Sequence, residues 1–474
     1  ESAVGEWLAR FPSMREVARK YVWFEPMMSA IGRQLLGEVG WGLKSRMITG
    51  ALLSVVDQIS DLLVAWYYLS SSNSDNHIYG YLTIGMVAVN IFFSTIVALI
   101  NHHKNPKAML WDLLWIFAGM KPLKDAMVVT SGGEKKGILS PILEMTFYKL
   151  VEMFAEAIPA CCVQVYALIL SEDRKTGVVL SALLAAFTTG FNVAIMSYDM
   201  DTSPSNRKNS PWIYGYIPDK NRERTVVFLC MIINSAMVVL SRALTVVFMC
   251  LVDIRIALGW LLFELFLYLL YKVLRRDFRY WIPFHSVASL AIAFIGRVIC
   301  KVVTDFTAMP HFRHPFELGG FYWTLNLILT QISLFISAYV YVENGDGEMR
   351  DEMVWKLISL LFGVWLVTFC VFLSFIKRSY LHTFISSMTG WGYTTFLFHS
   401  FPDDQQKAEC LFSVHRCHWK GIESEVEEWV LKNWDGWVND KQQWFEDIKA
   451  SIPEELKLKA GGEGVALSSE RSTK

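Results

Sequence analysis

The chain has 474 residues, of which 53% are hydrophobic and only 19% charged, and its formal net charge is −1. Soluble domains are typically about 25% charged, so this deficit indicates a membrane protein. No basic domain stands out, which excludes nucleic acid as an expected partner. Most of the cysteines fall inside apolar segments, where we expect small buried hydrophobic groups rather than a disulfide framework.

Residues 1–45 form an amphipathic, charged segment without the continuous apolar core of a signal peptide. Eight later stretches are apolar enough and long enough to cross a bilayer as helices, which takes roughly 17–25 residues. These stretches are 47–69, 79–100, 142–170, 177–196, 225–250, 254–271, 319–342 and 353–376. Two further apolar segments are doubtful, because 108–120 is too short to cross and 287–304 carries Arg297 and Lys301.

The charge of the connections predicts the topology. Connections 101–141, 198–224 and 272–283 are rich in Lys and Arg, whereas 70–78 and 343–352 are poor in them. Because basic loops stay in the cytoplasm, the charges fit best if both doubtful segments are re-entrant from that side. We therefore predict an all-α polytopic membrane protein with eight transmembrane helices, two re-entrant helices and both termini in the cytoplasm.

The order of these elements suggests an internal repeat. Residues 46–198 and 224–376 each contain two spans, a dipping segment and two more spans, and a cytoplasmic linker at 199–223 joins them. We predict two pseudo-symmetric halves, with a polar path possible between them. Residues 377–459 are predicted to form a small, Trp-rich, helical cytoplasmic region, followed by a disordered tail at 460–474.

Two acidic pairs lie inside the predicted spans. Asp57 and Asp61 are four residues apart and share one helix face, and Glu152 and Glu156 repeat that spacing. A charge at bilayer depth costs roughly 2.5–3.5 kcal/mol on insertion scales, so these groups are expected to line a protein interior or a polar path. Pro159 follows the second pair and is expected to kink its helix.

Three further polar residues complete the candidate lipid or ion path. Lys149 lies one turn before Glu152, Gln164 extends the polar face, and Arg242 lies in the middle of the fifth span. One hypothesis is that these charges only join helices as an ion-pair network. The other is that some of them line a groove or pore, since the acids outnumber the bases and leave surplus negative charge.

Other candidate sites are weaker. Cys410, His415, Cys417 and His418 match no strong zinc spacing, so we predict no metal site. We expect the His102-His103 pair to be a feature of an interfacial loop. No phosphate-binding loop, metal-binding HExxH motif or nucleophile elbow occurs, so neither a cofactor nor enzyme activity is predicted.

Four stretches resemble the XK-related family of membrane proteins, of which the chain looks like a diverged member. They are VDQISDLLVAWYY at 56–68, LVEMFAEAIPACCVQVYALI at 150–169, SRALTVVF at 241–248, and the break at Met120–Pro122. The second is the most specific, because it is similar to a Leu-x-Glu-x-x-x-Glu-Ala-x-Pro-x-x-x-x-Gln helix of the family. The C-terminal region is unlike the caspase-cut tail of that family.

The resemblance implies eight spans plus two re-entrant helices, and an energy-independent phospholipid scramblase of the plasma membrane. Asp57, Asp61, Glu152, Glu156 and Arg242 would then form a charged track for lipid head groups. Two alternatives stay open: a cation-preferring ion channel or transporter, and a non-transporting scaffold. The scaffold would act through a protein that binds the tail or through an accessory membrane subunit.

Overall fold

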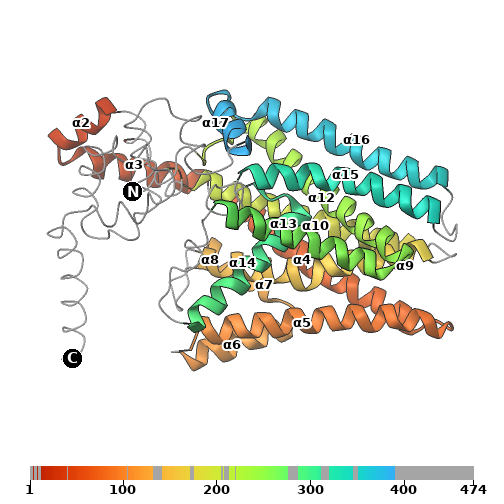
Figure 1. Cartoon of the computed structure of the whole chain (residues 1–474). Coiled ribbons are helices and arrows are strands. Elements are labelled where there is room, and N and C mark those ends of the chain that lie inside the picture. Colours follow the sequence, from red (N-terminus) through yellow and green to blue (C-terminus); the bar gives the residue numbers. More distant parts are fainter. Residues whose placement is uncertain are drawn as a thin grey trace.

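The computed structural model describes residues 12–39, 41–103, 105–131, 141–170, 176–203, 213–218, 220–275, 287–310, 320–344 and 351–389, with Val4, Leu8 and Arg207 besides. Within these ranges the chain forms helices and no strand. The long helices lie side by side along one common direction, which gives a single bundle (Figure 1).

Eight helices are long and apolar enough to cross a membrane, and they coincide with the eight predicted spans. They are α4 (Trp41–Leu69), α5 (His77–Asn101), the continuous run of α8 (Pro141–Glu152), η2 (Met153–Ala157) and α9 (Ile158–Leu170), α10 (Thr176–Thr202), α12 (Asn221–Val252), α13 (Ile254–Arg275), α15 (Gly320–Asn344) and α16 (Asp351–Phe375). By the length and composition of these helices, the chain is an integral, multi-pass membrane protein.

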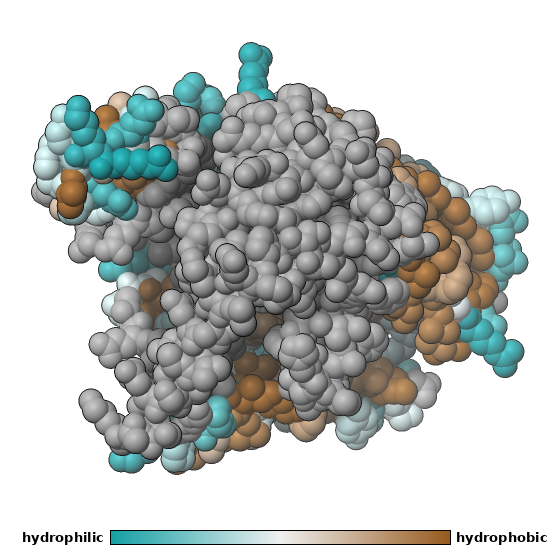
Figure 2. Space-filling model, turned by 60° about the vertical axis from the view of Figure 1, so that its left-hand side comes forward, coloured by the Kyte–Doolittle hydropathy of each residue, from teal (hydrophilic) through white to brown (hydrophobic). Residues whose placement is uncertain are grey.

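The spans differ in how much of their surface the bundle covers. The apolar windows of α10 and α12 are 72% and 67% buried, whereas those of α5 and α16 are only 22% buried. The central position of α10 and α12 and the outer position of α5 and α16 are visible in Figure 1. Hydrophobic residues also cover the flanks of the bundle that Figure 2 exposes, as expected for surfaces that face lipid.

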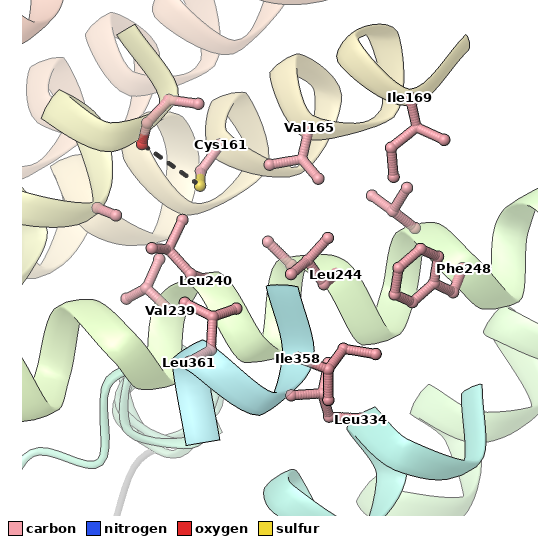
Figure 3. Packing of buried hydrophobic residues seen from close by; sticks show 14 of the residues in the cluster. Cys161, Val165, Ile169, Val239, Leu240, Leu244, Phe248, Leu334, Ile358 and Leu361 are labelled. Carbon is pink, nitrogen blue, oxygen red and sulfur yellow. Dashed lines mark hydrogen bonds between the residues drawn. The ribbon is translucent and has the colours of Figure 1, made fainter. Parts of the chain in front are cut away.

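The bundle core forms where α9, α12, α15 and α16 meet. Leu240, Leu244 and Phe248 of α12 pack between residues of the other three helices, including Val165 and Leu334 (Figure 3). Close approach of α10 to α12 depends on Gly190, because a Cβ there would lie 2.6 Å from the carbonyl oxygen of Ile232. Small residues at such a contact let two backbones pack tightly within a membrane.

The two doubtful segments form helices that are separate from the eight spans. The first gives α6 (Pro106–Phe117), whose 12 residues reach only about 18 Å. After a turn at Gly119, which has φ +70°, the chain enters α7 (Lys121–Thr130), a helix that the sequence analysis did not predict. The second gives α14 (Val287–Thr307), which is long enough to cross but is not among the apolar helices.

Three further helices precede and follow the spans in the described part of the chain. Helices α2 (Pro12–Lys20) and α3 (Phe24–Val39) extend beyond the end of the bundle that carries α6 and α7 (Figure 1). Helix α17 (Arg378–Thr389) packs on α15, where the Thr324 hydroxyl donates to the Met388 carbonyl at 2.7 Å. The predicted Trp-rich helices, the Cys and His cluster at 410–418 and the tail at 460–474 lie outside the described residues.

Candidate functional site

The first acidic pair lies on the inner face of α4. Asp57 and Asp61 are both buried, and the Gln164 side chain of α9 donates to Asp61 Oδ1 at 2.7 Å. This contact, which the sequence analysis did not predict, places Gln164 beside the first acidic pair. Asp57 Oδ1 and Asp61 Oδ2 have no hydrogen-bond partner among the described residues. The pair therefore contributes two carboxylates that are only partly compensated.

The second pair lies where the helix changes its winding. Residues 153–157 form a π-helix, and the Ile158 amide bonds back to the Met153 carbonyl. Pro159 has no amide hydrogen for the Ala155 carbonyl, and its ring would clash with that group in a regular α-helix. The wider turn of the π-helix removes this conflict. Such turns occur often at functional sites.

The π-helix directs Glu156 toward α5. The Asn90 side-chain amide donates to Glu156 Oε2 at 2.5 Å, while Glu156 Oε1 is buried without a partner in the described part of the chain. Glu152, one turn earlier, is half-buried. Lys149 is buried, and its ammonium forms no hydrogen bond within the described residues. Within the described residues, none of the four carboxyl groups therefore forms a hydrogen bond with Lys149.

A small cavity of about 50 Å³ joins these residues, and we call it the acid cavity. It has room for about one or two water molecules. Its walls come from α4, α5, the turn before α7, α8 and η2. The polar residues that line it are Ser54, Asp57, Gln58, Asn90, Ser94, Lys121, Tyr148, Glu152 and Glu156. Its lining therefore includes three of the four predicted acids.

A second charged cluster lies at the end of the bundle near α6 and α7, and its centre is Lys121. The buried Lys121 ammonium donates to Asp125 at 2.6 Å, Glu144 at 2.8 Å and Asp112 at 3.2 Å. Its Nζ also lies 4.2 Å from the centre of the Tyr148 ring. Lys124 makes an additional ion pair with Asp112. The cluster is therefore held by close ion pairs between helices that the sequence analysis did not connect.

His102 belongs to the same cluster. His102 lies in the turn that ends α5, and its buried Nε2 lies 2.9 Å from Asp112 Oδ2. Burial lowers the pKa of His102 below its usual value, despite the nearby Glu144 carboxylate. Burial also raises the pKa of Asp125 to about 6, and it outweighs the lowering effect of the Lys121 ammonium.

His102, Asp112 and Glu144 bring three potential metal ligands together, with their ligand atoms within 4.8 Å of one another. The Lys121 ammonium, however, lies 3.2 Å and 2.8 Å from the same Asp112 and Glu144 oxygens. An ion bound there would have to displace this ammonium. The geometry is therefore that of an ion-pair cluster whose cationic position is already filled by lysine.

Arg242 is placed in a different cluster from the four acids. Its guanidinium pairs with Glu264 of α13 and donates to Asn326 Oδ1 at 2.6 Å and to the Asp305 carbonyl at 3.2 Å. The Asp305 side chain in turn pairs with Lys301. Glu264 and Asn326 were missed, although Glu264 is the acidic residue of the predicted span 254–271 and could have been noticed for that reason.

Three cavities follow one another along α5. A groove of about 470 Å³, here the apolar groove, is lined by α5 residues from Ile78 to Val89. The acid cavity follows at Asn90 to Ser94, and a space of about 950 Å³, here the vestibule, follows at His102. The run of α8, η2 and α9 passes the cavities in the opposite chain direction. Its Glu144 lines the vestibule, and its Pro159 lines the apolar groove. From Ile78 to His102 the row covers about 36 Å, enough to cross the roughly 30 Å of a bilayer's hydrocarbon.

The chain matches no known family profile, no curated protein and no solved structure. Its function is therefore argued from its own residues and geometry.

Proposed function

We propose that this protein is an energy-independent phospholipid scramblase of the XK-related type, which moves lipid head groups along an intramembrane charged track. The observation that carries the proposal is the row of three cavities along α5, with the acid cavity at its centre. A scramblase has to lower the cost of bringing a charged head group through hydrocarbon, and polar groups in the bundle interior do this.

The position of α5 suits this task. Its outer face exposes apolar residues such as Tyr81, Leu82 and Phe92, while its inner side carries Asn90 and Ser94 of the acid cavity. The acid cavity thus lies on the inner side of α5, while the apolar groove, which Tyr81 and Leu82 help to line, lies on the side that faces lipid. A head group could follow the row while its acyl chains remain in the bilayer, so no wide pore is needed.

Incomplete compensation of the carboxyl groups favours the same proposal. Asp57, Asp61 and Glu156 each have one carboxyl oxygen without a hydrogen-bond partner in the described structure. Lys121, the basic residue in the wall of the acid cavity, donates to three other carboxylates. A purely structural network would be expected to balance its charges, because an uncompensated buried charge is costly. The ammonium group of a passing head group would supply the missing positive charge.

The proposal includes the topology predicted from the loops. Both termini would lie in the cytoplasm of a plasma-membrane protein, and α6 with α7, and α14, would enter the membrane from that side. The spans from α4 to α10 and from α12 to α16 would form two pseudo-symmetric halves. In this arrangement the vestibule would open toward the cytoplasmic leaflet.

A cation-preferring channel or transporter is the second candidate. The surplus carboxylates of the acid cavity favour it, since rings of Asp and Glu select cations in known pore designs. Against it, the acid cavity has a volume of only about 50 Å³. A scaffold that acts through the C-terminal region remains a third proposal, and that region lies outside the described residues.

The decisive experiment is reconstitution of the purified chain into liposomes that contain a fluorescent phospholipid. Addition of a membrane-impermeant reductant should quench most of the fluorescence if lipids exchange between leaflets, and about half if they do not. We expect Glu152→Gln to slow the exchange, because it removes a charge from the wall of the acid cavity. Glu223→Gln is the matched control, since Glu223 lies at the exposed start of α12 and pairs with Lys220.

The same liposomes distinguish the candidates. Loss of fluorescence no greater than in protein-free vesicles would overturn the scramblase proposal. Cation flux that Glu152→Gln reduces, without any lipid exchange, would support the channel instead.

A further inference from the structure

The apolar groove lies between α5 and the helix run of η2 and α9, and its volume is about 470 Å³. One wall includes Tyr81, Gly85 and Met86 of α5, and the other includes Phe154 and Pro159. None of the described residues that line it is charged. Because α5 is an outer helix whose apolar part is only 22% buried, the groove lies on the side of the bundle that faces lipid (Figure 1).

The length of the groove matches one leaflet of the membrane. Its α5 residues run from Ile78 to Val89, which corresponds to about 17 Å along the helix. Beyond Val89 the groove is closed, because the rings of Phe93 and Phe154 are in contact, with their centres 6.4 Å apart. The hydrocarbon of a bilayer is roughly 30 Å thick, so a second transmembrane helix would need a groove about twice as long. The groove therefore suits a molecule that occupies a single leaflet.

The middle of the groove is open because two small residues face it. A Cβ at Gly85 would meet no atom within 4 Å, and Ala155 of the π-helix contributes only a methyl group to the opposite wall. Met86 beside them has a flexible side chain that adapts to a ligand. This open space fits a flat, rigid ring system. A rigid ligand is also favoured over an acyl chain because it loses less conformational entropy when it binds.

The outer end of the groove offers a hydroxyl group but no cation. Tyr81 lies about one turn after the start of α5 and is 66% exposed, a position typical of tyrosines at the boundary between head groups and hydrocarbon. Its hydroxyl can donate and accept hydrogen bonds. The connection at 70–78 that leads into α5 contains Asp75 but neither Lys nor Arg. A phosphate would therefore find no basic partner there, whereas a neutral lipid with one hydroxyl group would be complementary.

We propose that the apolar groove binds one sterol molecule from the leaflet at the start of α5. The sterol hydroxyl lies at Tyr81, the ring system lies along Gly85, and the hydrocarbon tail contacts Val89 and Phe154. This inference goes beyond the proposed function, since the bound sterol is not transported. Under the proposed function a bound sterol would also cover one end of the row of cavities and slow lipid exchange, and only this consequence rests on that function.

The test measures binding and requires no transport. The full chain is placed in phosphatidylcholine nanodiscs with a trace of photoactivatable cholesterol, and the labelled peptides are mapped. We expect labelling of α5 that unlabelled cholesterol suppresses and that Gly85→Leu reduces about tenfold, because the leucine side chain fills the space of the ring system. Gly259→Leu is the matched control, since Gly259 is likewise exposed near the start of the apolar span α13, and a Cβ there meets no atom within 4 Å.

A second variant, Tyr81→Phe, removes only the hydroxyl of an exposed residue and should reduce the labelling about threefold, as expected for the loss of one hydrogen bond. It keeps the inference testable if Gly85→Leu does not fold.

Two outcomes would overturn the inference. One is equal sterol labelling of α5 in the wild type, in Tyr81→Phe and in whichever glycine variants fold. The other is stronger labelling of α5 by phosphatidylcholine with a photoactivatable acyl chain, which would show that a phospholipid chain occupies the groove. Specific sterol labelling without lipid exchange would leave the sterol site standing and refute only the proposed function, whereas lipid exchange without sterol labelling would do the reverse.

Discussion

The N-terminal spans (α4 to α10) and the C-terminal spans (α12 to α16) differ in how far their buried charges are compensated by neighbouring groups. Around Arg242 the charges are balanced, since Glu264, Asn326 and the Asp305 carbonyl occupy the guanidinium. Around Glu156 they are not, because Asp57, Asp61 and Glu156 each have a carboxyl oxygen without a partner in the described structure, and the buried Lys149 ammonium has no hydrogen bond there either. Both clusters lie in helices of similar apolar character.

This difference separates a structural role from a role in a transport path, which could not be told apart in the sequence. A balanced, fully hydrogen-bonded group joins helices, and its removal should disturb folding. A buried charged group without a counter-charge contributes little to the contact between helices. Its free-energy cost is offset if a mobile cation or lipid head group binds to it. We therefore assign the Arg242 cluster to the structure of the bundle and keep the acid cavity as the candidate path.

The largest effect is expected where the balanced cluster is broken. Glu264→Ala leaves the buried Arg242 guanidinium without its carboxylate and should destabilise the protein by roughly 3–5 kcal/mol. The double variant Arg242→Met with Glu264→Leu should recover most of this loss, because well-packed apolar pairs often replace buried ion pairs. Thermal unfolding in detergent, read by gel filtration, measures both. A Glu264→Ala variant as stable as the wild type would contradict the structural assignment.

The second effect concerns the contact between α10 and α12, where the N-terminal spans meet the C-terminal spans. Gly190→Ala puts a methyl group 2.6 Å from the Ile232 carbonyl oxygen, so α10 and α12 must move apart. We expect a loss of about 1–3 kcal/mol in the free energy of unfolding. Gly363→Ala on α16 is the control, since a Cβ there meets no atom within 4 Å. Equal melting temperatures for the two variants would refute close packing of α10 against α12 at Gly190.

The third effect tests the unbalanced cluster directly. Glu156→Gln keeps an acceptor for Asn90 but removes a surplus charge, so stability should change by less than about 1 kcal/mol. Transport should fall about tenfold, which corresponds to roughly 1.4 kcal/mol on the barrier. Lipid exchange in liposomes gives the transport rate, and thermal unfolding of the same preparation gives the stability. A severe folding defect with no specific loss of transport would show that Glu156, like Arg242, has a structural role.

The fourth effect is a pH dependence of stability that comes from Asp125. Its pKa is about 6 in the folded protein and about 3.9 in an unfolded chain, so between these values the folded state binds more protons. Stability therefore falls as pH rises from about 4 to 6, and is recovered on acidification through the same window. Melting temperatures of the wild type and of Asp125→Asn from pH 4.5 to 7.5 isolate this contribution. A constant difference between the two curves would be inconsistent with it.

Local patterns predicted much of this molecule correctly. The eight spans were found from apolar runs. The contact of Gln164 with Asp61 was not predicted, because it depends on how α9 packs against α4. The π-helix before Pro159 was not predicted either, because the way a backbone accommodates a proline depends on its neighbours. Helix α7 was missed because its polar residues and Pro122 resemble a loop.

The sequence by itself determined which segments are apolar helices and which of them carry charges, because hydropathy, length and helical spacing are local properties. Only the tertiary structure decided which charges meet. Arg242 bonds to Asn326, 84 residues away, and Asn90 bonds to Glu156, 66 residues away. These choices depend on the order and rotation of packed helices. For that reason the balanced and the unbalanced cluster could be distinguished only once the helices were packed.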